Sequence, residues 1–188
     1  MRRVQSVHAS PRYGCAIAAV TDLLIRLKLD FAFVGNVARS AWLGSGVERG
    51  SLDLIALMTP EQKNNVAMMA NNRGFRVDRD EIALSEELDL VPLNFADPEG
   101  EIRVHVLVGS NALYGRMVKA AVAVVLSGGD DTNFRVAAAE DLALLLALGE
   151  DDDSRRGAEM LIRLPGFDRA AYNGRLVSIG FPQLVVNE

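Results

Sequence analysis

The chain has 188 residues, of which 49% are apolar and 24% are charged, and its formal net charge is -5 at pH 7. This length suffices for one domain with a buried core and a small appendage. A net negative chain is not expected to bind nucleic acid nonspecifically. Every apolar run is shorter than the ~20 residues that span a bilayer, so we expect no membrane association.

The N-terminal region predicts an arm followed by a helix. Residues 1–12 show little pattern, as in a partly ordered arm. Residues 15–29 carry apolar side chains at helical spacing. Basic residues precede this run, as in a signal peptide, but Thr21 and Asp22 interrupt it, so we interpret it as a helix. Cys15, the only cysteine, is expected to be buried there, and a chain without disulfides favours the cytoplasm.

Residues 31–57 predict a strand, a turn, a short helix and a second strand. The first strand is the apolar run 31–34, which Gly35 ends. Residues 37–43 favour a helix. Three glycines then indicate an irregular connection over residues 44–50.

The second of these strands, residues 51–57, contains a lone carboxylate. Because side chains alternate along a strand, Ser51, Asp53 and Ile55 share one face. Asp53 is the only acid in this strand, and it follows a glycine-rich turn. It is either part of a phosphate or metal site or a residue that caps a backbone turn.

The middle of the chain predicts a capped helix and a hairpin. Thr59-Pro60-Glu61-Gln62 combines an N-cap, a proline at the first helical position and a capping-box glutamine. Residues 78–90 are acidic and expected at the surface. Residues 91–95 and 101–108 predict two strands joined by the turn 97–100, with His105 and Glu101 on the same face.

The remainder predicts a helix, two short strands and a helical C-terminal part. The helix covers residues 111–122, and the strands cover 123–126 and 134–136. Helices are then expected at 142–148, 154–164 and 167–179, with the acidic run 150–153 at a helix N-terminus. We therefore expect an α/β core with an N-terminal helix over residues 1–137 and a helical part over 138–188 packed on it.

Several of these sequence motifs resemble those of the nucleotidyltransferase superfamily, in particular of its small prokaryotic members related to abortive-infection and toxin–antitoxin transferases. In that family a strand ends in Gly-Gly or Gly-Ser, a short helix follows, and Asp-x-Asp stands on the next strand. Here Gly35-Asn36 occupies the first position and Ser51-Leu52-Asp53 the second. His105 occupies the position of a third acid on a later strand. The resemblance extends over roughly residues 17–164.

The resemblance implies an α/β (α+β) fold, with a nucleotidyltransferase-like mixed twisted sheet flanked by helices and a helical C-terminal part. It also implies transfer of a nucleotidyl group from an NTP with Mg²⁺ held by three acids. Of these acids the chain keeps Asp53 alone. Ser51 offers a neutral oxygen, and His105 prefers softer metals and supplies no negative charge.

We therefore interpret the chain as a catalytically degenerate nucleotidyltransferase-like protein that retains nucleotide binding or a protein-interaction role. Asp53 is the candidate catalytic residue, and Asp53 and His105 are the candidate metal ligands. The candidate NTP-binding residues are Gly35, Asn36, Ser51, Arg39 and Arg49. The expected partners are an NTP and either a second protein or a second copy of the chain.

The alternative is an active Mg²⁺-dependent nucleotidyltransferase with a rearranged metal site. In that case Glu48 or Glu101 would replace a missing acid, and the acceptor would be a small molecule, RNA or protein. The competing interpretation for Arg39 and Arg49 is that they are surface residues without a role in binding. For His105 it is that the residue is an ordinary half-exposed strand residue.

Overall fold

The structure is a computed structural model that describes residues 5–77, 89–127, 132–149 and 151–181. The chain divides into two compact units, Met1–Ala137 and Ala138–Glu188. The acidic segment predicted at 78–90 lies almost wholly outside the described residues. None of the described helices has the length and apolar character needed to cross a membrane.

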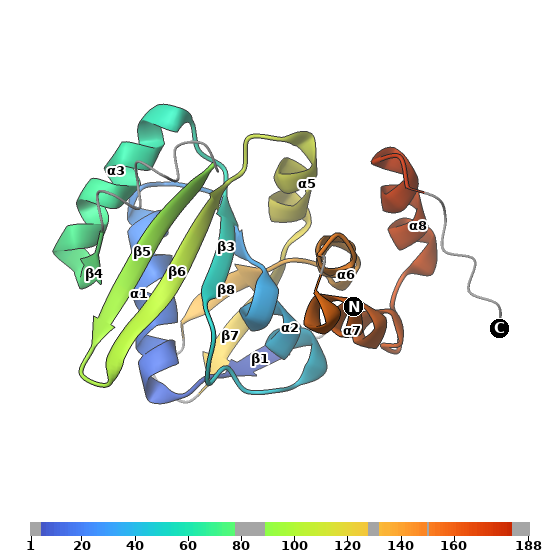
Figure 1. Cartoon of the computed structure of the whole chain (residues 1–188), viewed down its shortest axis with the longest axis horizontal. Helices are drawn as coiled ribbons and strands as arrows, with labels where there is room; N and C mark the ends of the chain where they lie inside the picture. The colour runs from blue at the N-terminus through green and yellow to red at the C-terminus, as the bar shows by residue number, and fades with distance from the viewer. Residues whose placement is uncertain (1–4, 78–88, 128–131, 150, 182–188) are drawn as a thin grey trace. The chain divides into compact units, whose positions relative to one another are not determined.

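The first unit contains a mixed sheet that has eight strands in the described residues (Figure 1). The spatial order is β1-β7-β8-β2-β3-β6-β5-β4. Strand β3 lies inside the sheet, antiparallel to β2 and parallel to β6. The strands are β1 (Gln5–His8), β2 (Phe31–Phe33), β3 (Leu52–Ala56), β4 (Phe75–Arg76), β5 (Leu90–Asp97), β6 (Gly100–Val108), β7 (Val122–Ser127) and β8 (Asn133–Val136).

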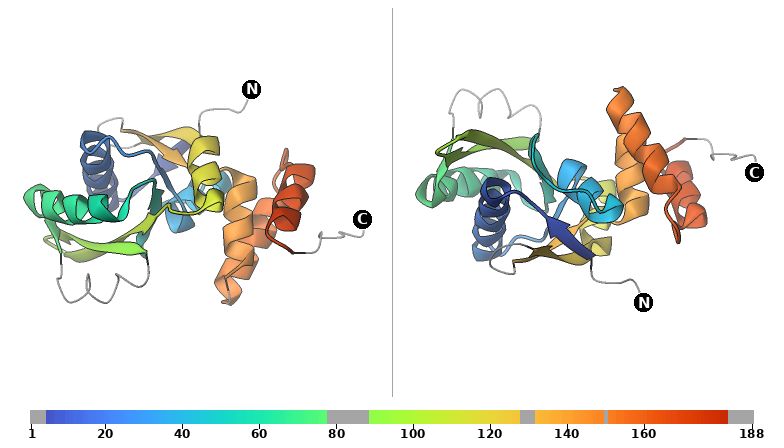
Figure 2. Two further views of the ribbon diagram at one scale, coloured as in Figure 1. Left: turned by 90° about the horizontal axis from the view of Figure 1, so that it is seen from above. Right: turned by 90° about the horizontal axis from the view of Figure 1, so that it is seen from below.

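Helices lie against both faces of this sheet. The views from above and below show α1 and α3 on the same side of β5 and β6 (Figure 2). Helix α2 contacts β1, β3 and β8, and α5 contacts β2 and β3. The helical segments of this unit are α1 (Pro11–Arg26), α2 (Gly35–Leu43), α3 (Pro60–Ala70), the 3₁₀ turn η1 (Asn71–Arg73) and α5 (Ala112–Ala120).

A large part of the core is a continuous apolar face of the sheet. Residues that oppose each other in register point to the same side. Phe33 opposes Leu54 on β3 and Val136 on β8, so three strands contribute to one layer. The rings of Phe33 and Phe134 meet edge to face with centroids 5.1 Å apart. Buried members of this layer include Phe33, Leu52, Leu54, Val104, Val106, Leu93, Phe134 and Val136.

The hairpin of β5 and β6 confirms the predicted alternation. The two strands close where Asp97 opposes Gly100. The β6 residues that face the core are buried, whereas Arg103 is exposed and His105 is half-buried on the opposite face. The predicted capping box of α3 is also present, with the backbone N–H of Thr59 donating to the Gln62 side chain at 2.8 Å.

The N-terminus differs from the sequence expectation. Instead of an arm, Gln5–His8 forms a strand that pairs in parallel with β7, and α1 begins at Pro11 rather than at residue 15. A parallel partner more than a hundred residues away leaves no local signature, so the strand could not be recognised. Cys15 was expected in the core, but it lies on the exposed side of α1.

The second unit consists of helices in its described residues, as predicted. They are α6 (Ala139–Ala147), α7 (Asp152–Ile162) and α8 (Arg169–Ser178). Asp151 caps α7, because its carboxylate accepts hydrogen bonds from the backbone N–H and the hydroxyl of Ser154. These hydrogen bonds, the hydroxyl first, hold the pKa of Asp151 below its ordinary value.

A buried ionic group connects α6 and α8 within this unit. Glu140 and Asp141 are only 2% and 0% exposed. Arg175 Nε lies 2.8 Å from Asp141 Oδ1, and its Nη1 lies 3.9 Å from Glu140 Oε2. The other carboxylate oxygen of Glu140 accepts the backbone N–H of Asp168 at 3.1 Å. Because a buried carboxylate is costly without a cation, Arg175 is needed for the stability of the unit.

We expect Arg175→Ala to lower the free energy of unfolding by about 3–5 kcal/mol, since it leaves buried carboxylates without that cation. The matched control is Arg163→Ala, which breaks an exposed ion pair with Glu159 and should cost less than about 1 kcal/mol. Urea denaturation followed by circular dichroism measures both. Equal costs for the two variants would contradict this account.

Candidate functional site

Three sequence-predicted residues meet on one face of the sheet at β3 and β6. Asp53 opposes His105 in the parallel register. His105 Nδ1 lies 2.7 Å from Asp53 Oδ1, and Ser51 Oγ lies 3.0 Å from each carboxylate oxygen. A carboxylate accepts hydrogen bonds, so Nδ1 carries the proton and Nε2 is the ring nitrogen left for another partner. The side chains of Asp53 and His105 are 26% and 34% exposed.

Gly35 brings the N-terminus of α2 against this carboxylate. Its φ is +54°, a left-handed value that favours glycine. A Cβ on this residue would lie 2.7 Å from Asp53 Oδ2, so no side chain fits without displacing the carboxylate. The N-cap residue of α2 is Val34, which has no capping side chain. Asp53 therefore supplies the negative charge that the positive end of the helix dipole favours.

Asn36 holds the loop that leads to Ser51. Its Nδ2 donates to the backbone carbonyl of Arg49 at 2.6 Å. The hydroxyl of Tyr13 on α1 donates to the next carbonyl, that of Gly50, at 2.8 Å. The backbone N–H of Val47 donates to the carbonyl of His8 at 2.8 Å. The loop is thus fixed by hydrogen bonds to α1, α2 and β1, and the Asn36 amide takes part in this network.

The two candidate arginines lie near this loop and on α2. Arg39 is half-buried, three residues beyond Asn36 on the helix. The Arg49 side chain is exposed, and within the described residues it forms no ion pair. The structure therefore brings together Gly35, Ser51, Asp53 and His105, whereas it shows no contact of the Arg49 side chain with them.

The residues of this cluster do not fit a pair of magnesium ions. Such a site needs several carboxylate oxygens, and here one carboxylate accepts from a hydroxyl and an imidazole. Among the described residues, no three histidine, cysteine, aspartate or glutamate side chains group as metal ligands. Glu101 pairs with Arg76 at 2.6 Å and lies four residues along β6 from His105, about 13 Å away. Glu48 is exposed in the loop.

Two further polar residues, Asn94 and Arg103, lie on the same face of the sheet as His105 and are not among the residues predicted from the sequence. On β5, Pro92 opposes His105 and Asn94 opposes Arg103. The sequence contains the signal needed to find them. Once Asp97 is placed opposite Gly100 in the predicted turn, counting back along both strands sets Asn94 beside Arg103.

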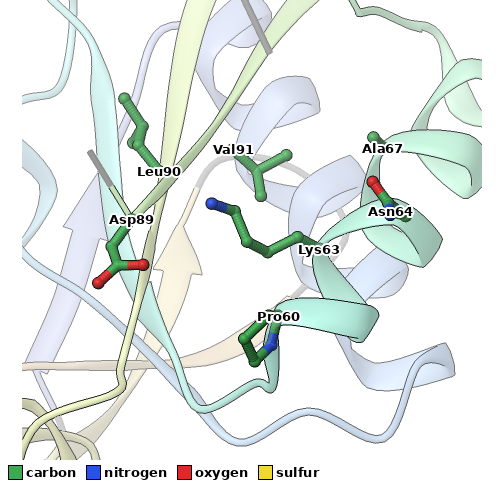
Figure 3. Close-up of a pocket in the computed structure, with 7 residues that line it drawn as sticks. All are labelled: Pro60, Lys63, Asn64, Ala67, Asp89, Leu90 and Val91. Carbon is green, nitrogen blue, oxygen red and sulfur yellow. The ribbon is translucent and has the colours of Figure 1, made fainter. Parts of the chain in front are cut away.

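A separate pocket of about 280 Å³ lies between α3 and the start of β5 (Figure 3). The Lys63 side chain extends into it between Asp89 and Val91. Four of its lining residues are apolar, and it also presents one cationic and one anionic side chain. Its lining residues are Pro60, Lys63, Asn64, Ala67, Asp89, Leu90 and Val91. The pocket does not include any residue of the Asp53 cluster.

No family model and no curated protein matches this sequence. Among solved structures, an antigenic nucleotidyltransferase-like protein from Paracoccidioides brasiliensis matches with a TM-score of 0.57 at 14% identity, covering 92% of this chain and 90% of that one. The antibiotic-resistance factor ANT(2'')-Ia matches with a TM-score of 0.47 at 13% identity, covering 89% of this chain and 94% of that one. The first match confirms a nucleotidyltransferase-like fold.

We expect Gly35→Ala to destabilise the protein by about 2–3 kcal/mol, because it combines a left-handed backbone with a clash at Asp53. The matched control is Gly44→Ala, which has a similar φ of +71° but no atom within 4 Å of the added Cβ. That variant should cost about 1 kcal/mol. Thermal and urea unfolding measure both costs.

A double-mutant cycle separates the backbone from the clash. In an Asp53→Ala background the carboxylate is gone, so the cost of Gly35→Ala should fall by about 1 kcal/mol or more. An unchanged cost in that background would contradict the proposed contact between residue 35 and the Asp53 carboxylate.

Proposed function

We propose that this protein is a degenerate member of the nucleotidyltransferase-like fold, which binds a nucleotide but has lost efficient metal-dependent nucleotidyl transfer. The observation that carries the proposal is the surroundings of the Asp53 carboxylate. It is the only carboxylate of the Ser51–Asp53–His105 cluster, and it accepts hydrogen bonds from both neighbours. The groups that would bind a second doubly charged ion are a hydroxyl and an imidazole.

Retention of nucleotide binding is supported by the features around that cluster. The cluster remains accessible, with His105 about one-third exposed. Hydrogen bonds hold the preceding loop in a single arrangement, which lowers the conformational cost of binding.

A protein-interaction role is the second part of the proposal. It comes from the sequence resemblance to prokaryotic abortive-infection and toxin–antitoxin-related transferases, which adds the expectation of a cytoplasmic partner protein or a second copy of the chain. The solution mass from size-exclusion chromatography with light scattering tests the second copy. A monomeric mass at micromolar concentration would argue against it.

The test of nucleotide binding is calorimetric titration with ATP, GTP, CTP and UTP, each with and without Mg²⁺. We expect at least one nucleotide to bind, and Asp53→Ala to weaken binding about tenfold or more, since it removes the group that orients Ser51 and His105. The matched control is Asp152→Ala, which removes a carboxylate that is 83% exposed in the second unit. Equal affinities for wild type and Asp53→Ala would remove the proposed site.

The test of lost catalysis is release of pyrophosphate from the same nucleotides with Mg²⁺ or Mn²⁺ and candidate RNA, protein or small-molecule acceptors. We expect no release above the no-enzyme background. A clear Mg²⁺-dependent transfer that Asp53→Asn abolishes would overturn the proposal in favour of an active enzyme with a rearranged metal site.

A further inference from the structure

The pocket between α3 and β5 lies on the opposite face of the sheet from the Asp53 cluster (Figure 3). Val91 in its wall opposes Val106 on β6, and Val106 opposes Leu54 on β3. Opposed residues point to the same side of a sheet, whereas neighbours along a strand point to opposite sides. Val91 therefore shares the face of Leu54, and Asp53 belongs to the other face. A ligand in this pocket would not cover the Asp53 cluster.

The pocket contains a cation and an anion that do not pair with each other. The Lys63 side chain is half-buried and extends into the pocket. It forms no hydrogen bond or ion pair with Asp89 or with any other residue that the structure describes. A cation that is partly withdrawn from water without a partner is costly. An anionic group of a ligand would therefore be stabilised beside Lys63.

The position of Asp89 is fixed by hydrogen bonds to the end of β6 and the residues after it. Its backbone carbonyl accepts the N–H of Val108 at 2.7 Å, and its carboxylate accepts the hydroxyl of Ser110 at 3.4 Å. Its φ is +47°, a left-handed value that aspartate tolerates better than most residues. Because a carboxylate can accept about four hydrogen bonds, Asp89 keeps acceptor capacity for a cationic group of a ligand.

The rest of the pocket provides apolar contacts and limits the size of the ligand. Val91 and Ala67 are 2% and 9% exposed, and Pro60 and Leu90 complete the apolar part of the lining. The volume of about 280 Å³ is just below the range of roughly 300–1,000 Å³ that is typical of sites for drug-sized ligands. The pocket therefore suits a small molecule that has one anionic group, one cationic group and a short apolar body.

We propose that this pocket binds an apolar α-amino acid in its zwitterionic form. The Lys63 ammonium pairs with the ligand carboxylate, and the Asn64 amide donates a further hydrogen bond to it. The Asp89 carboxylate pairs with the ligand ammonium, and the ligand side chain contacts the apolar lining. Both charges of the pocket are then paired. This inference is independent of the proposed function, because it concerns the other face of the sheet.

NMR titration of the full chain with leucine, isoleucine, valine and methionine tests this inference. We expect at least one of them to bind with a dissociation constant below about 1 mM. Glycine keeps both charges but has no apolar body, so it should bind about tenfold more weakly or worse. The two analogues of the tightest ligand that lack its amino group or its carboxylate should also bind about tenfold more weakly. Absence of binding for all four amino acids overturns the inference, and so does equal binding of glycine.

Two substitutions identify which end of the ligand each charge binds. Lys63→Met removes the charge and keeps the apolar stem. It should weaken the amino acid and its deamino analogue about tenfold, and it should not weaken the amine that lacks the carboxylate. Asp89→Asn keeps a residue that tolerates the left-handed backbone. It should weaken the amino acid and the amine about tenfold, and it should not weaken the deamino analogue.

This selectivity is a readout that a merely structural role would not give, because damage to the pocket weakens all three ligands alike. The control is Lys119→Met, an equal change in net charge at an exposed side chain on α5, which should leave all three affinities unchanged. Equal weakening of the three ligands by both variants, or no weakening by either, overturns the inference.

Nucleotide titrations of the same variants separate this inference from the proposed function. Lys63→Met and Asp89→Asn should leave nucleotide affinity unchanged, since no residue of the pocket belongs to the Asp53 cluster. A loss of nucleotide affinity in both variants would place the nucleotide in this pocket and overturn the inference. Selective amino-acid binding without binding of any nucleotide supports the inference and overturns the proposed nucleotide site.

Discussion

The close approach of Asp53 to the first residue of α2 governs the architecture around the cluster. Strand β3 and helix α2 come so near that a Cβ at position 35 would lie 2.7 Å from the carboxylate. This separation fixes where the helix begins, and the Asp53 carbonyl accepts the backbone N–H of Val34 at 2.8 Å. One residue thus connects a strand and a helix: its backbone pairs with β6 and with Val34 directly after β2, and its side chain meets the helix N-terminus.

The same residue explains why the fold and the chemistry can be separated. A carboxylate at the N-terminus of a helix can be stabilised by the helix dipole, by a metal ion or by protein hydrogen-bond donors. Here the donors are the Ser51 hydroxyl and the His105 ring. Ser51 and His105 therefore supply hydrogen bonds to the one negative charge of the cluster. A nucleotidyltransferase-like sheet is compatible with such a cluster, because the apolar layer around Phe33 and Leu54 lies on the other face.

Local sequence patterns predicted most of the elements, because their signals are local. The capping box at Thr59 and the turn at Asp97 each depend on residues within a few positions. The alternation in β6 likewise predicted which side of the strand carries His105. The fold itself came from the resemblance, since strands and helices in this order are compatible with several mixed topologies.

The parts that sequence reasoning missed depend on distant pairing. Strand β1 pairs with β7, which lies more than a hundred residues away in the sequence. Residues 1–12 show no periodicity that would predict this strand. The hydrogen bond between Asp53 and His105 requires the register of β3 against β6, and the two residues are 52 positions apart in the chain. Cys15 was misplaced because its neighbours, not its own type, decide which side of α1 it occupies. The register within the hairpin is different, because the turn at Asp97 and Gly100 places Asn94 beside Arg103.

The hydrogen bonds around Val47 make three distant segments one cooperative unit. Val47 donates to the carbonyl of His8 and accepts from the backbone N–H of Ser10, while Tyr13 holds the carbonyl of Gly50. Separation of β1 from β7 would expose the backbone groups of β7 and would also release the loop that ends at Ser51. Amide protons of the edge strand and of this loop should therefore exchange with solvent in the same opening event, although some forty residues separate them.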